Sequence, residues 1–506
     1  MDKTAPRCAL CGRKPRGACP ALEKIICPAC CGSGRGSKIH CIPSCGYFPF
    51  SIPGYDLWLE VDTKLVHKKM SYLKSCYSYR EFQEVVEQMR FSDEDSGTAE
   101  GAAVYYLFFV KRGSDGHALA QKWQAEGWQG LNNDERIMME HRLNCRATVI
   151  EIQKVLDHQR LECIDLLEPE KGSFVLIDRA TAARSVRFTR MLTWFVHYPY
   201  FSRMANNGVE IPDLVFAEFM EALRDTFRKE HRKNKVLTIK DYLSKAFGVF
   251  CALVYDLSQK KSIAALERMD LHQCKAMYKI IGNYTEIKAA LDNYPDFEKR
   301  ERHPDEKEVA GAYYYSWLRR GQSKALEKDM PLHFHHGDER EEGVGTVGNV
   351  SLLPDKLIIE VFSKQKYAFA KEMVKKFFGD NLILQNEAVV DLAKQQAAKI
   401  EDNYEDYVER RVLDKEEGSS ENIPPEIERE LIQKMHRRHY SVFLEDKIPA
   451  LDNMTPRQAA SSLQMRTRLI ELMKQHLKGI EKQNKDRGLD LNINWVLDEL
   501  SLPELK

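Results

Sequence analysis

Apolar residues recur at helical spacing in the part of the chain that follows residue 50. They fall near a period of 3.6 residues in four segments, which are 57–70, 82–89, 102–111 and 134–144. A polar break at 92–101 separates the second segment from the third. The pattern therefore predicts a helical domain over residues 51–146.

The pattern changes after residue 146, where β-branched and aromatic residues form short runs bounded by turn residues. The runs are 147–156, 160–167, 173–180 and 187–198. Runs of this length and composition are typical of strands, and we predict a small antiparallel sheet or barrel. A helix at 212–233 completes this region, 147–235, and another helix is predicted at 239–260.

Strands and helices alternate in the region 236–413, which predicts an α+β domain. Strands are expected at 271–281, 312–319, 349–352, 356–361 and 381–385, and helices at 285–291 and 365–378. The last two strands and the helix between them form part of a β-α-β passage. The charged segment 298–308 is expected to be exposed.

A linker is predicted at 414–425, where glycine, serine, acids and paired prolines oppose packing. The helix predicted after it, 426–444, has four residues expected to point inward, which are Leu431, Ile432, Met435 and Tyr440. We interpret residues 426–506 as a C-terminal helical module.

Thr455 and Pro456 mark the start of a helix inside this module, because threonine is a good N-cap and proline a good first helical residue. An amphipathic helix is predicted at 466–480, and a last short helix holds Trp495 and Leu500. Together the regions predict an α+β fold that is mostly helical and multidomain, with a cysteine-rich module at 1–50, a central small antiparallel β region and this module.

Composition adds limits on function. The chain has 506 residues, of which 43% are hydrophobic, and Lys plus Arg equal Asp plus Glu at 76 each, so no overall field favours nucleic acid or a membrane. The longest apolar stretches, 102–110 and 246–255, are shorter than the roughly 20 residues of a membrane helix. No apolar run follows Met1. We therefore expect a cytoplasmic protein without a membrane partner, in which clustered cysteines bind metal.

Eight of the thirteen cysteines lie within 8–45. Zinc takes four thiolate or imidazole ligands in a tetrahedron, usually as close pairs from two tight turns. Adjacent residues such as Cys30 and Cys31 point in different directions, so they are expected to serve different ions. We predict two zinc ions with interleaved ligands: Cys8, Cys11, Cys27 and Cys30 for the first, and Cys19, Cys31, Cys41 and Cys45 for the second. His40 is an alternative ligand of the second ion.

All-thiolate zinc sites are closed to substrate and fold short segments, so a structural role is expected for the metal. The zinc deaminase signature is absent, and no other constellation predicts a reaction. The alternative is that the zinc module contacts nucleic acid through its basic residues, which are Arg13, Lys14, Arg16, Arg35 and Lys38.

Other motifs are interpreted as structural. Gly343, Gly345 and Gly348 match GxGxxG, but an acidic run precedes them and a strand follows, which indicates a flexible turn. Three histidines, His333, His335 and His336, are expected in a solvated loop, with metal binding as the alternative.

Two further groups of residues are also interpreted as structural. Asp355 and Glu360 lack the spacing of a metal-nuclease motif. The aromatic run 313–317, which precedes Arg319, could stack on nucleic acid, but alternation on a half-buried strand explains it equally well.

Two stretches of the sequence resemble known proteins. The phrase IPALDNMTPRQAA resembles the C-terminal, toxin-binding domain of bacterial Xre/MbcA/ParS-type antitoxins. This tail and the head CPACCGSGRGSKIHCIPSC are similar to uncharacterised bacterial proteins with a CPxCCG/CPxxC head, some of which carry SEC-C zinc motifs. Asp165-Leu-Leu167 and Asp178-Arg179 match the β region of those proteins. No helix-turn-helix is identified, which departs from the antitoxins.

The resemblance implies a protein partner for the C-terminal module and no reaction. We therefore expect a non-enzymatic zinc-binding interaction or regulatory protein that binds a toxin or another protein through this module. The alternative is a nucleic-acid-associated factor that binds through the basic zinc-binding head.

Overall fold

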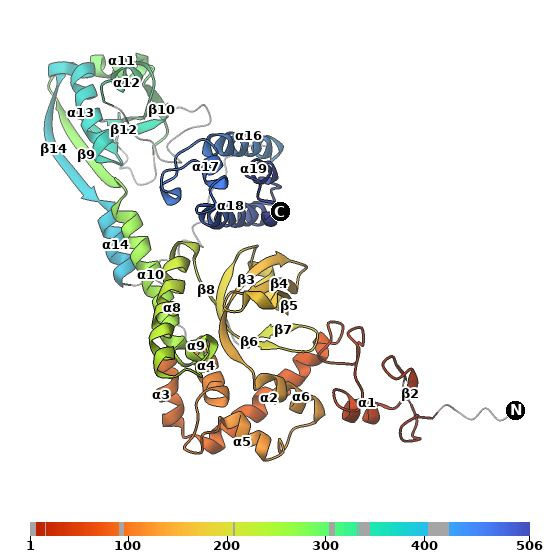
Figure 1. Ribbon diagram of the computed structural model, residues 1–506. Helices are drawn as coiled ribbons and strands as arrows, with labels where there is room; N and C mark the ends of the chain where they lie inside the picture. The colour runs from red at the N-terminus through yellow and green to blue at the C-terminus, as the bar shows by residue number, and fades with distance from the viewer. Residues whose placement is uncertain are drawn as a thin grey trace. The chain divides into compact units, whose positions relative to one another are not determined.

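The computed structural model describes residues 7–15, 17–90, 96–205, 208–302, 309–330, 332, 345–402 and 425–506. The chain forms two compact units (Figure 1). The first unit combines Met1–Ser258 with Ser420–Lys506, and the second unit is Gln259–Ser419. About 51% of the residues are helical and 20% are in strands, which confirms a mixed α+β fold.

The head, residues 1–50, contains little regular structure. A two-stranded antiparallel ribbon, β1 (Gly17–Cys19) and β2 (Lys24–Ile26), leads into the short helix α1 (Pro28–Gly34). Five of its buried side chains form a cluster of their own, which are Cys8, Cys19, Ile26, Cys27 and Ile39. Three others, Cys45, Phe48 and Phe50, belong to the main core of the first unit. So small an apolar cluster does not stabilise a domain of this size without a further cross-link.

Helices dominate the next part of the first unit. They are α2 (Tyr55–Cys76), α3 (Tyr79–Met89), α4 (Ser96–Phe109), α5 (Leu119–Ala125) and α6 (Asn133–Arg142). A capping box between Ser78 and Glu81 starts α3. The predicted break at 92–101 is wrong from Ser96 onward, because α4 already begins there. The sequence also missed α5, which is a short helix that buries Trp123.

The four predicted strand runs correspond to strands. These are β3 (Arg146–Val155), β4 (Arg160–Asp165), β5 (Ser173–Ile177) and β6 (Arg190–His197), with short additional strands β7 (Ser202–Met204) and β8 (Val209–Glu210). Because β3 pairs with β6 as well as with β4, the strands close into a five-stranded barrel in the order β3-β4-β5-β7-β6. The β5–β7 pair is parallel, whereas the other pairs are antiparallel.

The end of the third predicted run is not a strand. Asp178 caps a short helix there, α7 (Arg179–Arg184), by accepting a hydrogen bond from the backbone N–H of Thr181. A 3-10 turn, η1 (Pro169–Lys171), joins β4 to β5. After the barrel come α8 (Asp213–Lys233), α9 (Ile239–Lys245) and α10 (Phe247–Glu267). The single helix predicted at 239–260 is therefore divided at Ala246.

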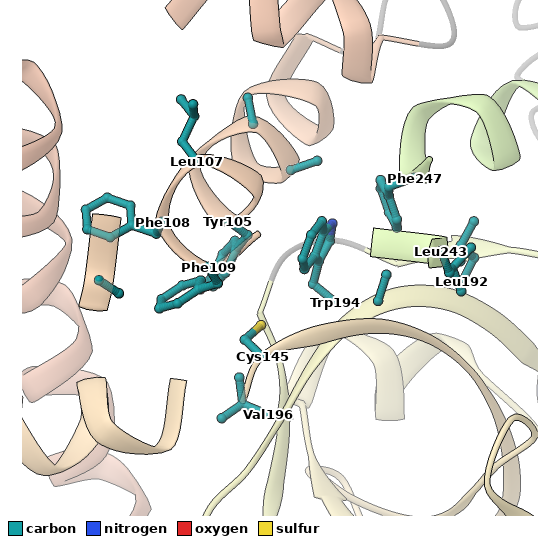
Figure 2. Close-up of a cluster of buried hydrophobic side chains, with 14 of the residues drawn as sticks. Tyr105, Leu107, Phe108, Phe109, Cys145, Leu192, Trp194, Val196, Leu243 and Phe247 are labelled. Carbon is teal, nitrogen blue, oxygen red and sulfur yellow. The ribbon is translucent and has the colours of Figure 1, made fainter. Parts of the chain in front are cut away.

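One hydrophobic core joins the helices to the barrel (Figure 2). Trp194 on β6 lies at its centre, with ring centroids 6.2 Å from Tyr105 on α4 and 5.5 Å from Phe247 on α10. Phe109 packs on Tyr105 at 5.7 Å. Helices and barrel thus share buried side chains on both sides of residue 146.

The second unit is a six-stranded antiparallel sheet in the order β10-β11-β12-β13-β9-β14. Its elements are β9 (His272–Ile280), α11 (Tyr284–Asn293), β10 (Phe297–Arg300), β11 (Tyr313–Leu318), α12 (Gly321–Leu326), β12 (Thr346–Leu352), β13 (Lys356–Val361), α13 (Lys364–Phe378), η2 (Gly379–Asn381), β14 (Leu382–Asp391) and α14 (Leu392–Asp402). Alternate strand residues pack against the helices α11, α12 and α13.

Several predictions in this region need correction. In the charged segment 298–308, Glu298, Lys299, Glu301 and Arg302 are exposed, as predicted. Residues 298–300 belong to β10, a strand that the sequence did not predict and that pairs with β11, while 303–308 lie outside the described residues. Gly348 lies inside β12, where an added Cβ would come within 2.4 Å of the Glu360 carbonyl oxygen, so it belongs to a strand rather than to a flexible turn. Residues 333–344, which include the three histidines and Gly343, lie outside the described residues.

The C-terminal module is helical, as predicted. It consists of α16 (Pro425–Phe443), η3 (Pro449–Leu451), α17 (Pro456–Ala460), α18 (Arg466–Arg487), α19 (Asn494–Glu499) and η4 (Pro503–Leu505). Thr455 caps α17 in a capping box with Gln458. Met435 does not point inward, since 57% of it is exposed, whereas Tyr440 is buried. Of the predicted linker, 414–424 lie outside the described residues, as does the side chain of Leu431.

Among the described residues, no helix is both long and apolar enough to cross a bilayer.

Candidate metal centre

Four cysteines of the head converge on one point. The Sγ atoms of Cys8, Cys11, Cys27 and Cys30 all lie within 4.8 Å of one another, and those of Cys11 and Cys27 are 3.6 Å apart. Zinc bound 2.3 Å from each sulfur in a tetrahedron separates the sulfurs by about 3.8 Å. The donor set and its spacing therefore fit a tetrahedral thiophilic ion. We call these four residues the cysteine tetrad.

Local turns place the tetrad. After Cys8 the chain turns tightly, with the Gly12 N–H donating to the Cys8 carbonyl at 2.8 Å and Gly12 at a φ of +69°, a conformation that glycine adopts readily. Cys27 is the N-cap of α1, and the Cys30 N–H donates to its sulfur at 3.5 Å. Pro28 at the first helical position fixes the backbone there. Each Cys-x-x-Cys pair is thus set by its own sequence.

The electrostatics of the tetrad favour a bound cation. Burial opposes ionisation of Cys8, but backbone N–H donors led by that of Cys27 lower the pKa of its thiol to about 6. The Cys30 N–H lowers the pKa of Cys27. The neighbouring sulfurs of Cys11 and Cys27 raise the pKa of Cys30 to about 12. Four sulfurs at these distances cannot all ionise beside one another unless a cation offsets their charge.

The other four head cysteines share a cavity. Cys19, Cys31, Cys41 and Cys45 line a space of about 180 Å³. Burial, followed by smaller contributions from neighbouring cysteines, raises the pKa of Cys31 and that of Cys41, the latter to about 11. Within the described residues, however, the tetrad is the one group whose ligand atoms are close enough to hold an ion. His40, the alternative ligand, is exposed and does not line this cavity.

The head is attached to helix α6. Arg35 forms a two-point ion pair with Asp134, in which its Nε lies 2.7 Å from Oδ1. The side-chain amide of Asn133 donates to the carbonyl oxygens of Gly32 and Arg35 at 2.8 and 2.9 Å. The sequence analysis missed Asn133 and Asp134, because contacts nearly 100 residues apart leave no local pattern.

These contacts reduce the number of basic residues of the head that are free to meet a phosphate. Arg35 is engaged by Asp134 and is not exposed, whereas Arg13, Lys14 and Lys38 are exposed. Arg16 lies outside the described residues. Three of the five basic residues are therefore placed where a phosphate could reach them.

The remaining sequence candidates occupy structural positions. Glu360 on β13 accepts a hydrogen bond from Gln273 Nε2 at 2.6 Å. Tyr315 and Trp317 on β11 are buried, and their polar atoms bond to Asp292 at 2.9 Å and Ser323 at 2.9 Å. These two rings belong to the core of the second unit rather than to a stacking platform.

One group went unnoticed in the sequence. His436, His439 and His476 lie around Tyr440 in the C-terminal module. The spacing His-x-x-His on a predicted helix was the available signal, because residues three apart share a helix face.

The chain was compared with known proteins. No family model, curated protein or solved structure matches it significantly.

Proposed function

We propose that this protein is a non-enzymatic, zinc-binding interaction or regulatory protein. The observation that carries the proposal is the cysteine tetrad, four thiols gathered at the spacing that zinc requires. A closed four-thiolate site has no position for a substrate, so its ion stabilises the head and does no chemistry.

A second zinc ion is part of the proposal. Cys19, Cys31, Cys41 and Cys45 face one cavity of about 180 Å³, and metal binding draws them together into the second site of an interleaved pair. Because all four side chains already line the same space, this closure needs small movements of the chain between 31 and 45.

The C-terminal module is the proposed binding surface for a protein partner. Its helix α16 exposes Met435 and Val442, which are 57% and 52% exposed and lie seven residues apart on one helix face. Leu463, before α18, is 97% exposed. Met435 and Val442 form the α16 face, which fits the toxin-binding role that the antitoxin resemblance implies. An exposed apolar surface of this kind is typical of an interaction site.

Contact with nucleic acid is the alternative function. Arg13 and Lys14 are exposed directly after Cys11, beside the tetrad. A patch this small meets few phosphates, so its affinity would be weak and would fall with salt.

Metal analysis of the untagged full chain tests the first part of the proposal. Two equivalents of zinc are expected in wild type, with loss of zinc in a Cys11→Ser variant. A protein that carries no zinc after purification without chelator contradicts the proposal.

Affinity capture tests the second part. Wild type and a Met435→Asp/Val442→Asp variant are compared for a protein retained at stoichiometric amount, with Leu214→Asp as control, since Leu214 on α8 is 66% exposed and lies outside the module. We expect capture to be lost in the double variant alone. Retention of nucleic acid that is released by salt, without any protein, supports the alternative instead.

A further inference from the structure

Three histidines meet in a groove between two helices of the C-terminal module. His436 and His439 lie three residues apart on α16, and His476 lies on α18. The ring centroid of Tyr440 is 4.8 Å from that of His436, 5.1 Å from His439 and 5.5 Å from His476. All three imidazoles therefore surround one tyrosine.

The groove holds an open cavity of about 370 Å³ lined by the three imidazoles together with Tyr440, Gln475, Gly479, Ile480 and Gln483. No carboxylate lines it, so its donor atoms are nitrogen and amide oxygen. Imidazole-rich donor sets bind divalent zinc, nickel and copper in preference to magnesium or calcium.

The surroundings of His476 prepare it to act as a ligand. The Tyr440 hydroxyl is hydrogen-bonded to His476 Nδ1 at 2.9 Å, and Phe443 packs against the same ring at 4.8 Å. With Nδ1 engaged, Nε2 is the nitrogen left for a metal, and such a second contact orients metal-binding histidines in general.

We propose that His436, His439 and His476 form a transition-metal site of three imidazoles. Within the described part of the chain only the cysteine tetrad has all its ligand atoms within 4.8 Å, so the histidine site closes by side-chain rotation. His439 is exposed, so its ring, which packs edge-on against Tyr440, can rotate toward the groove. Gly479 keeps the cavity open, because a Cβ built there meets nothing within 4 Å.

Unlike the cysteine tetrad of the head, the histidine site would leave its metal able to bind a further ligand. Three protein ligands leave a coordination position open for water or for a ligand atom of a partner. The metal also links α16 to α18 directly. The proposal stands apart from the zinc head, since no residue is shared.

Nickel binding by untagged full-length protein, with the head first saturated with zinc, tests the site. Equilibrium dialysis against Ni²⁺ is expected to find one further equivalent in wild type. His476→Gln and the double variant His436→Gln/His439→Gln should each lose it. His117→Gln is the matched control, because His117 is an exposed histidine outside the module, and it should bind as wild type does.

A fourth variant separates ligand loss from misfolding. Gly479→Leu fills the cavity while it keeps all three histidines, and leucine favours a helix more than glycine does. It is expected to abolish the extra equivalent with an unchanged thermal midpoint in the absence of nickel. Absence of extra nickel in wild type overturns the proposal, as does extra nickel that persists in both His476→Gln and the double variant.

Discussion

The two ends of the chain, the head and the C-terminal module, differ in the size of their apolar cores. The head keeps five buried side chains in a cluster of its own, of which three are cysteines, while its other buried residues, Cys45, Phe48 and Phe50, join the main core of the first unit. The C-terminal module buries a continuous apolar cluster that runs from Tyr440 on α16 to Leu505 in η4. The small cluster of the head lies beside four thiols that could hold a metal ion, whereas the module has an apolar core and needs no such cross-link. Small size alone therefore does not decide how a segment is stabilised.

The two ends also differ in how they attach to the rest of the first unit. The head uses Arg35 and the backbone of α1 against α6. The module uses a larger ionic network, in which Arg190 on β6 pairs with Glu151, Asp213 and Glu471. Arg190 is 2% exposed, so its guanidinium is more deeply buried than that of Arg35, whose side chain is 17% exposed, while its partner in the module, Glu471, is 40% exposed.

An aromatic side chain completes the attachment of the module. Phe188, at a φ of +61°, leaves the barrel and joins the apolar cluster of the module. A bulky residue in this region of φ is strained unless its surroundings hold it. Lys474 on α18 bridges to Glu151 at 2.8 Å and lies 5.4 Å from the Phe188 ring. Phe188 and Lys474 therefore join the module to the barrel by apolar and ionic contacts together.

Loss of a metal ligand should have the largest effect. In Cys27→Ser the tetrad loses one of its four sulfurs, the one that also caps α1, while the serine hydroxyl still serves as a cap. Structural zinc contributes on the order of 10 kcal/mol, so the head should unfold completely. Hydrogen exchange should show loss of protection across 8–45 and unchanged protection in α18. Cys76→Ser, at an exposed cysteine, is the control, and a protected head in metal-free Cys27→Ser protein would contradict the comparison.

Removal of the buried arginine should come next. Arg190→Met leaves Glu151, Asp213 and Glu471 without their shared cation, and breaking one side of a buried ion pair costs about 3–5 kcal/mol. Urea denaturation should show this loss, with early exposure of α18. Arg184→Met, at an exposed arginine, should change the free energy of unfolding little. Equal effects of the two changes would refute a docking role for Arg190.

Truncation of a buried leucine tests whether the C-terminal module is stabilised by its apolar core without metal. Leu469 is fully buried in the module, and Leu469→Ala should cost about 2–5 kcal/mol. Leu463→Ala, at a leucine that is 97% exposed, should stay within about 0.5 kcal/mol of wild type. The cost at Leu469 should be the same with and without chelator. A loss of unfolding free energy at Leu469 that grows on metal removal would mean that the head and the module are coupled.

The smallest effect is expected at the attachment of the head. Arg35→Ala leaves the partly exposed Asp134 unpaired, which should cost about 1–3 kcal/mol. Exchange should rise at the contact between α1 and α6 while zinc content is retained. Arg13→Ala serves as control because Arg13 is exposed. Zinc loss in Arg35→Ala would show that docking and metal binding are one event.

Local spacing explains what the sequence could predict. The convergence of the first four cysteines was predicted because Cys-x-x-Cys places each pair through one tight turn, and the structure brings them together. The second set depends on the path of residues 31–45, which no short pattern encodes, and its closure stays a prediction. The four long barrel strands were predicted from the length and the β-branched and aromatic composition of their runs, but β7 and β8 are too short to show either. β10 was missed because its sequence, FEKR, has a single apolar residue.

The first unit is interrupted in sequence by the second, and this has a consequence for synthesis on the ribosome. Arg190 and its partner Glu471 are 281 residues apart, which at ordinary elongation rates means a delay of about 14–56 s. During this interval the barrel surface that will receive α18 faces water. Charged side chains are well solvated, so their exposure to water costs little free energy. An exposed apolar surface of equal size would promote aggregation while translation continues. Ion pairs are therefore well suited to an interface, such as that between the barrel and α18, which forms last.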